Sequence, residues 1–180
     1  WTGCLLGQSM LEALIFVVFP FCMVFAALSD TLSMTIANRV PLLLVAVFAI
    51  VAPMTGMDWL DYGWHFAAGT LVLVVTFGLF ALGGMGGGDA KLLAASALWM
   101  GFGFQLVEYL VVSTFLGGAL TLAIVVYRGS PLAVFTGGNL FLRNFADRKK
   151  GIPYGIALGI GGLIAFPGSP LAIWALQQLA

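Results

Sequence analysis

Gly83-Gly84-Met85-Gly86-Gly87-Gly88-Asp89-Ala90-Lys91 separates two long apolar segments of this chain. An acidic residue beside the hydrocarbon layer of a membrane is costly and indicates a functional site. Glycines remove side chains, so that backbone or substrate can approach such an acid closely. The composition of the stretch is equally compatible with a plain connector whose acid faces water, because membrane helices tolerate glycine freely. The function of this stretch therefore depends on which other groups lie close enough to Asp89 to act with its carboxylate.

The overall composition excludes an ordinary water-soluble domain. Hydrophobic residues make up 62% of the chain and charged residues 8%, with a mean hydropathy of +1.11. These values are typical of a polytopic membrane protein. A chain of 180 residues has room for about six helices of about 20 residues. We therefore expect an all-α protein with a single integral-membrane domain over residues 1–180.

Six apolar segments are expected to span the membrane. They cover about 10–28, 40–54, 66–82, 92–106, 109–126 and a last segment that begins near 152. The aromatic and acidic stretch 56–65, between the second and third segments, is typical of an interfacial turn. Pro167-Gly168-Ser169-Pro170 interrupts the last segment, so residues 171–180 are either the far end of a kinked helix or a short interfacial piece.

With six spans, all the basic residues fall on one side of the membrane. The seven are Arg39, Lys91, Arg128, Arg143, Arg148, Lys149 and Lys150. Basic residues are concentrated in cytoplasmic loops, so this side is predicted to be the cytoplasm and the N-terminus to lie outside. Apolar residues in the connector 129–150 predict that part of it lies on the membrane surface.

Several other chemistries lack the residues that they need. Cys4 and Cys22 do not form a CxxC pair and are expected to be inert packing residues. His65, the only histidine, is expected to pack at the interface, because a metal site would need companion ligands. We therefore expect no metal, no cofactor and no serine, cysteine or histidine nucleophile.

Two aspartates are predicted to lie at similar depth in the cytoplasmic leaflet. Asp30 follows the first span, and Asp89 lies between the third and fourth. If their carboxylates come within a few ångström, repulsion and desolvation raise one pKa while the other stays low. The pair then titrates as a unit. Such a pair can activate water and protonate a leaving amide, although spacing alone does not establish that the two residues meet.

The sequence around both aspartates resembles a known family. Gly86-Gly87-Gly88-Asp89 fits the G-x-G-D motif of membrane aspartic proteases, and Ala90-Lys91-Leu92-Leu93 is similar to its continuation in bacterial type IV prepilin peptidases. Ala26 to Asn38, which includes Asp30, is similar to that family's first aspartate segment. Ile152 to Ala157 matches the start of its last helix. The three motifs occur in the family's order and cover nearly the whole chain.

The resemblance implies that Asp30 and Asp89 are the catalytic pair and that Gly86, Gly88, Lys91 and Asn38 are motif residues along the substrate's approach. It implies an aspartic endopeptidase that needs no cofactor and cleaves the basic leader from a prepilin. The active site would face the cytoplasm from the bacterial inner membrane. Its partners would be a prepilin and membrane lipid, with no nucleic acid. Lys91 either favours the ionised form of the pair or anchors the helix start at the lipid headgroups.

The chain also departs from the family's pattern. Ala37 replaces a usual proline, and Thr31, Ser33, Met34 and Thr35 stand where basic residues are common. These changes bear on substrate fit. The connector after the first span is too short for the portion with paired cysteines that is linked to methylation. We therefore expect a peptidase without a methyltransferase portion, similar to the short peptidases of Flp or tight-adherence pili.

Other interpretations remain open. Archaeal preflagellin peptidases are close relatives of the short form, whereas presenilin-like proteases fit less well because their Tyr-Asp and Pro-Ala-Leu motifs are missing. A small transporter could instead use the two aspartates to bind a proton or cation, with the glycine stretch as a broken-helix loop. A structural membrane subunit without a site is the third possibility.

Overall fold

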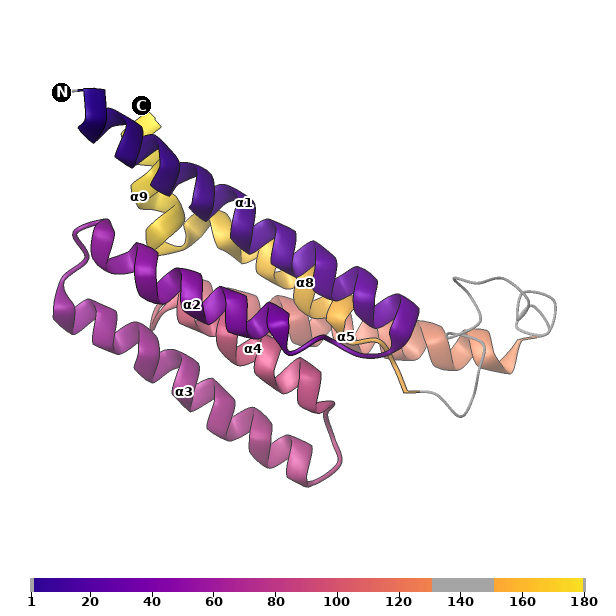
Figure 1. The fold of residues 1–180 in the computed structure, drawn as a ribbon. Coiled ribbons are helices and arrows are strands. Elements are labelled where there is room, and N and C mark those ends of the chain that lie inside the picture. Colours follow the sequence, from indigo (N-terminus) through magenta and orange to yellow (C-terminus); the bar gives the residue numbers. More distant parts are fainter. Residues whose placement is uncertain (1, 131–150, 180) are drawn as a thin grey trace.

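The computed structural model describes residues 2–130 and 151–179, and all regular structure within them is helical (Figure 1). The elements are α1 (Thr2–Ser33), α2 (Arg39–Met54), α3 (Trp59–Ala81), α4 (Gly87–Met100), α5 (Phe104–Gly129), α8 (Gly155–Ala165), the 3-10 helix η1 (Phe166–Gly168) and α9 (Pro170–Leu179). The predicted surface segment, with Arg143, Arg148, Lys149 and Lys150, lies in residues 131–150, outside the described residues. The predicted all-α class is confirmed.

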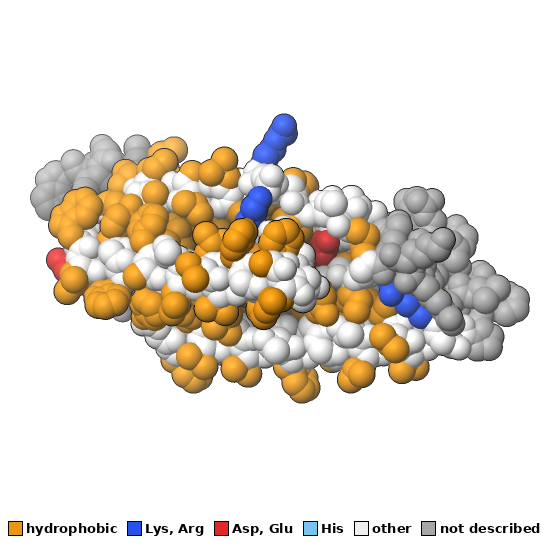
Figure 2. Space-filling view, turned by 90° about the horizontal axis from the view of Figure 1, so that it is seen from below, with side chains coloured by type: hydrophobic (Ala, Val, Ile, Leu, Met, Phe, Trp, Pro, Cys, Tyr) orange, Lys and Arg blue, Asp and Glu red, His pale blue; other side chains and the backbone are white. Residues whose placement is uncertain are grey.

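Three helices in the described part of the chain are long and apolar enough to cross a membrane. They are Gly7–Ser33, Trp59–Ala81 and Phe104–Gly129. A fourth crossing results if α8–η1 and α9, which meet at a bend of 51°, form one span. Apolar side chains are spread along the face shown in Figure 2, and many large apolar residues are exposed, as expected for a surface in contact with lipid. The fold is therefore that of a membrane protein with three to four such helices, and six spans stay a prediction.

Several helix boundaries differ from the predicted ones. Helix α1 extends to Ser33 and so includes Asp30, and α5 begins at Phe104 instead of 109. The interfacial turn predicted over 56–65 is wrong from Trp59 onward, because α3 begins there. Asp58 adopts an extended conformation and accepts a hydrogen bond from the backbone N–H of Leu60 at 3.2 Å, which caps the helix. The fourth segment ends at Met100 instead of continuing to 106, because Gly101 has φ +65° and ψ −176°. The chain then turns, and α5 begins at Phe104.

Helix α4 is the central helix of the bundle. It contacts α2, α3, α5 and α8, and every residue from Asp89 to Met100 except Lys91 is buried. Only 14 residues long, it is enclosed by protein at nearly every position, so it carries no lipid-facing stripe. Asp89 at its start therefore lies inside the protein.

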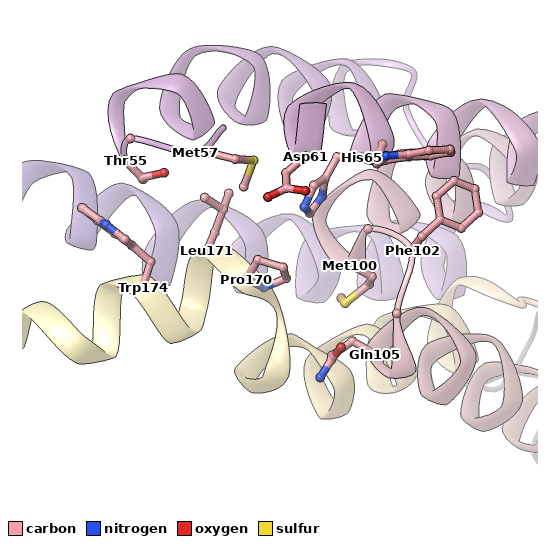
Figure 3. Close-up of a pocket in the computed structure, with 14 residues that line it drawn as sticks. Thr55, Met57, Asp61, His65, Met100, Phe102, Gln105, Pro170, Leu171 and Trp174 are labelled. Atoms are coloured by element: carbon pink, nitrogen blue, oxygen red, sulfur yellow. The ribbon is translucent and has the colours of Figure 1, made fainter. Parts of the chain in front are cut away.

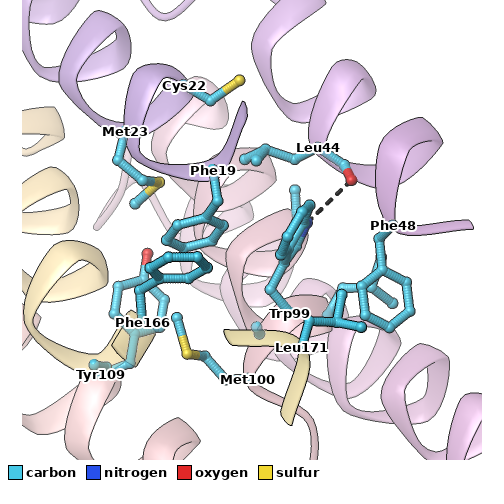
Figure 4. Packing of buried hydrophobic residues seen from close by; sticks show 14 of the residues in the cluster. Phe19, Cys22, Met23, Leu44, Phe48, Trp99, Met100, Tyr109, Phe166 and Leu171 are labelled. Atoms are coloured by element: carbon cyan, nitrogen blue, oxygen red, sulfur yellow. Dashed lines mark hydrogen bonds between the residues drawn. The ribbon is translucent and has the colours of Figure 1, made fainter. Parts of the chain in front are cut away.

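Aromatic side chains fix the other end of α4 (Figure 4). Trp99 is fully buried and donates a hydrogen bond from Nε1 to the Leu44 carbonyl of α2 at 3.0 Å. Phe19 of α1 stacks on Phe166 of η1 with ring centroids 4.6 Å apart, and lies 5.2 Å from the Trp99 ring. These contacts join α1, α2, α4 and η1. Because apolar side chains gain little by leaving lipid, close packing and satisfied polar groups are what hold such a bundle together.

A cavity of about 740 Å³ lies beyond this aromatic cluster, between the α2–α3 and α4–α5 connections and α9 (Figure 3). Its wall includes His65, whose Nδ1 is 2.7 Å from the Leu98 carbonyl oxygen and whose ring lies 5.1 Å from that of Phe48. The histidine is thus a buried packing residue of α3 with a backbone partner. Asp89 and this cavity lie at opposite ends of α4, roughly 16 Å apart at 1.5 Å per helical residue.

We expect Gly101→Ala to lower the free energy of unfolding by about 2–4 kcal/mol. The backbone conformation at Gly101 is one that only glycine adopts readily, and an added Cβ would lie 2.6 Å from Cε1 of His65. Thermal or denaturant unfolding in detergent measures the loss. Gly56→Ala is the matched control, because Gly56 has φ +80° but open space around its Cβ position. Equal losses in the two variants would contradict a steric contribution from His65.

Candidate active site

Asp30 lies near the end of α1, with 6% of its surface exposed. The helix closes just beyond it, because Met34 adopts a left-handed conformation with φ +56° and donates its N–H to the Asp30 carbonyl at 2.8 Å. A residue in this conformation commonly ends a helix. The stop at Met34 allows the next residues to turn toward α2 and leaves the Asp30 side chain inside the bundle.

The N-terminus of α8 holds the Asp30 carboxylate. The N–H of Gly155, the first residue of α8, donates to Asp30 Oδ2 at 2.7 Å. This amide belongs to the first turn, where N–H groups lack helical partners and favour a negative charge. A Cβ on Gly155 would lie 2.7 Å from Asp30 Cβ and 2.9 Å from Oδ2. Only glycine therefore lets α8 approach the carboxylate this closely.

Asp89 is the third residue of α4, and Gly86 is the residue that caps the helix. The carboxylate accepts a hydrogen bond from the Gly86 backbone, as the third residue of a capping box does. A Cβ on Gly86 would lie 2.6 Å from Asp89 Oδ2. The glycine at this position of the predicted motif thus makes room for the carboxylate itself.

The connection after Asp30 packs on the first turn of α4. A Cβ on Gly88 would lie 3.2 Å from Cβ of Ile36, which belongs to the α1–α2 connection. Lys91 donates from Nζ to Oδ1 of Asn38, the capping residue of α2, at 3.0 Å, and this pair is exposed. The structure therefore brings the predicted motif residues Gly88, Lys91 and Asn38 together at the end of the bundle where Asp30 and Asp89 lie. The hydrogen bond that Lys91 donates is therefore to the uncharged side chain of Asn38.

Burial and the neighbouring aspartate make Asp89 hard to ionise. Asp89 precedes the predicted fourth span and lies outside the candidate spans above. Burial first, and then the charge of Asp30, raise the pKa of Asp89 to about 7, while the hydrogen bond from Gly86 opposes the shift. Its Oδ1 atom is buried and has no hydrogen-bond partner among the described residues. A buried carboxyl with one unpaired oxygen can keep a proton at neutral pH and present it to a bound group.

Sequence reasoning named both aspartates but missed the role of Gly155. The resemblance of Ile152 to Ala157 to the start of the family's last helix gives Gly155 no role, and the Asp30–Gly155 contact joins positions 125 residues apart. The one available signal was the position of Gly155 directly after Pro153-Tyr154, where a helix start exposes unpaired N–H groups. Among the residues that the structure describes, no three histidine, cysteine or acidic side chains are grouped as metal ligands.

Comparison with known proteins identifies the family. Residues 17–126 match the type IV leader peptidase family, and this range includes both Asp30 and Asp89. No curated protein and no solved structure matches the chain. The match confirms the resemblance seen in the sequence motifs and indicates a peptidase that acts on pilin-like substrates. Since it covers more than half of the chain, this protein belongs to the type IV leader peptidase family.

Proposed function

We propose that this protein is an aspartic endopeptidase in which Asp30 and Asp89 together activate water to cut the basic leader from Flp-like prepilins. Family membership supports a leader peptidase. The observation that carries the aspartic mechanism is the pair of buried carboxylates at one end of the bundle, where the charge of Asp30 acts on Asp89. Peptide hydrolysis needs one base and one acid in the same site, and such a pair supplies both.

The environments of the two side chains suggest their roles. The Gly155 amide stabilises negative charge on Asp30 Oδ2, so ionised Asp30 takes a proton from water as the water oxygen attacks the scissile carbonyl carbon. Protonated Asp89 gives its proton to the carbonyl oxygen, which produces a gem-diol. Asp30 then passes its proton to the amide nitrogen, the C–N bond breaks, and a diol hydroxyl returns a proton to Asp89 as the new carboxyl group forms.

The proposed topology places this chemistry at the cytoplasmic face of the bacterial inner membrane. In the six-span arrangement, α2, the part of α4 that follows Lys91, and α8–α9 cross the bilayer together with the three longer helices. A prepilin has a short basic leader followed by an apolar helix, so its scissile bond reaches the membrane at the cytoplasmic surface. The concentration of basic residues near this end of the described chain, including Arg39, Lys91 and Arg128, supports that orientation.

Co-expression with an Flp-type prepilin tests the proposed function. We expect the wild-type protein to shorten the prepilin on a gel by the length of its leader, with the new N-terminus at the leader boundary by mass spectrometry. The same protein in sealed vesicles is expected to give no proton or cation flux. An uncut prepilin together with ion flux would overturn the proposal in favour of a transporter.

We also expect cleavage to fall as the pH rises through about 7. Asp89 must be protonated to donate, and its raised pKa of about 7 means that the singly protonated pair is lost above this value. The rate should drop by about tenfold per pH unit in the alkaline range. Measurement of kcat/KM in detergent between pH 5 and pH 9, with recovery of activity at pH 6 as the control for unfolding, checks this. A rate that stays constant to pH 9 would contradict the assignment of Asp89 as the acid.

A further inference from the structure

Helix α8 lies between α1 and α5 and contacts both. Glycines allow the close approach on each side. A Cβ on Gly159 would lie 3.0 Å from the Met23 carbonyl oxygen of α1, and a Cβ on Gly161 would lie 3.1 Å from the Ser113 backbone nitrogen of α5. Small residues bring helices close together, but they supply few side chains that interlock along the helix axis. The register of α8 along its neighbours therefore depends on contacts at its ends.

This register decides where the amide that binds Asp30 lies. The N–H of Gly155 donates to Asp30 Oδ2 at 2.7 Å in a buried contact. It belongs to the peptide group that joins Tyr154 to Gly155, and a peptide group is planar and rigid. Tyr154 caps α8, and its carbonyl oxygen, in the same peptide group, accepts the N–H of Leu158 at 3.0 Å. A shift of Tyr154 therefore moves the donor to Asp30 directly.

The side chain of Tyr154 attaches this peptide group to α5. Its hydroxyl oxygen lies 3.1 Å from Oγ1 of Thr121. The Thr121 hydroxyl group donates its one proton to the Gly117 carbonyl oxygen at 2.7 Å. Tyr154 is therefore the donor in the bond between the two hydroxyl groups, and the direction of that bond is fixed.

Gly117 lets the tyrosine ring lie against α5. A Cβ on Gly117 would lie 3.3 Å from Cδ1 and 3.4 Å from Cε1 of Tyr154. Gly117 and Thr121 are four residues apart and so share one face of α5. The ring and the hydroxyl group of Tyr154 thus contact two successive turns of this helix, which sets the position of the tyrosine along the α5 axis.

We propose that Tyr154 is a positioning residue of the peptidase, which holds the Gly155 amide against Asp30 through its hydrogen bond to Thr121. The inference rests on the proposed function, in which ionised Asp30 takes a proton from water. Helix α5 is one of the three long apolar helices, so it is the support on which the start of α8 is placed. Tyr154 takes no part in proton transfer and acts through the peptide group that it shares with Gly155.

Tyr154→Phe and Thr121→Val each remove the hydrogen bond and keep most of the side-chain volume. We expect each to lower kcat for prepilin cleavage about tenfold, with KM within about twofold of wild type, because a misplacement of about 1 Å costs about 100-fold and a smaller shift costs less. Thr121→Ser keeps the hydroxyl group and should retain kcat within about twofold of wild type. Thr114→Val is the matched control, since Thr114 is a threonine of the same helix outside this hydrogen bond.

The variant with both Tyr154→Phe and Thr121→Val should be no slower than the worse single variant, because both changes remove the same bond. Wild-type kcat in Tyr154→Phe would overturn the inference, and so would equal losses in Thr121→Ser and Thr121→Val. A loss confined to KM would also overturn it, because that indicates a contact with the substrate. If the wild type cleaves no prepilin, the proposed function itself fails.

Infrared spectroscopy tests the placement of the Asp30 carboxylate without a substrate. The difference spectrum between wild type and Asp30→Asn isolates the carboxylate stretching band of Asp30, whose frequency depends on the hydrogen bond from Gly155. We expect Tyr154→Phe to shift this band and Thr114→Val to leave it unchanged. An unshifted band in Tyr154→Phe would overturn the inference whether or not the protein cuts prepilin.

Discussion

Asp30→Asn and Asp89→Asn are each expected to lower the rate of prepilin cleavage by about 10³–10⁴-fold. Asparagine keeps the shape of the side chain, and its carbonyl oxygen can still accept the Gly155 amide bond that Asp30 receives at 2.7 Å. It cannot take a proton from water or give one to the substrate as the carboxyl group does. The loss should therefore appear in kcat, with the thermal unfolding temperature close to that of wild type. Single-turnover cleavage in detergent measures it.

A variant that carries both substitutions tests whether the two aspartates act together. Residues that act as one unit have non-additive effects, so Asp30→Asn with Asp89→Asn should be no slower than the worse of the two single variants. Asp61→Asn is the control, because Asp61 is exposed and lines the cavity at the opposite end of α4. A single variant that keeps activity within about tenfold of wild type would remove that aspartate from the mechanism.

Gly155→Ala is expected to lower kcat by about 100-fold. The added methyl group would lie 2.7 Å from Asp30 Cβ, so either α8 or the end of α1 must shift. A displacement of about 1 Å in a reacting group is sufficient for such a loss. Gly151→Ala is the control, since a Cβ at Gly151 meets nothing within 4 Å. Cleavage of prepilin by the two variants, at matched amounts of folded protein, gives the comparison.

The Asp30→Asn background shows whether Gly155 acts through Asp30. If it does, Gly155→Ala should reduce activity much less in that background than in the wild type, because neighbouring residues in one network show coupled effects. An unchanged hundredfold loss there would mean that the methyl group disturbs another part of the site. Wild-type activity of Gly155→Ala alone would show that the exact approach of α8 is unimportant for hydrolysis.

Local chemistry made part of this fold predictable. The second segment was expected over 40–54 and the helix runs from Arg39 to Met54, because an apolar run with proline in its first turn starts and stops within the segment itself. The glycine stretch separates α3 from α4, as expected. Asp89 lies in the first turn of α4, where the sequence placed it at the junction of two apolar segments.

Features that depend on distant residues could not be predicted. The burial of α4 on nearly all sides is invisible in hydropathy, since an apolar residue looks the same whether it faces lipid or protein. A proline pair allows either a kink or a helix stop, so the sequence does not determine whether the chain bends before α9, as it does by 51°. The clash distances around Gly101 and Gly155 arise from helices that meet in space. Glycine content alone did not distinguish these two from the glycines in open surroundings.

The bond between Gly155 and Asp30 spans 125 residues of sequence, which has a consequence for biosynthesis. The chain is made from its N-terminus, so both aspartates enter the membrane well before α8 is synthesised. A nascent chain that has not reached residue 155 carries both carboxylates but lacks the amide that orients the first of them. In the proposed mechanism, proteolytic competence therefore appears only when the final helices insert, and unfinished chains are inactive while their pilin substrates are made beside them.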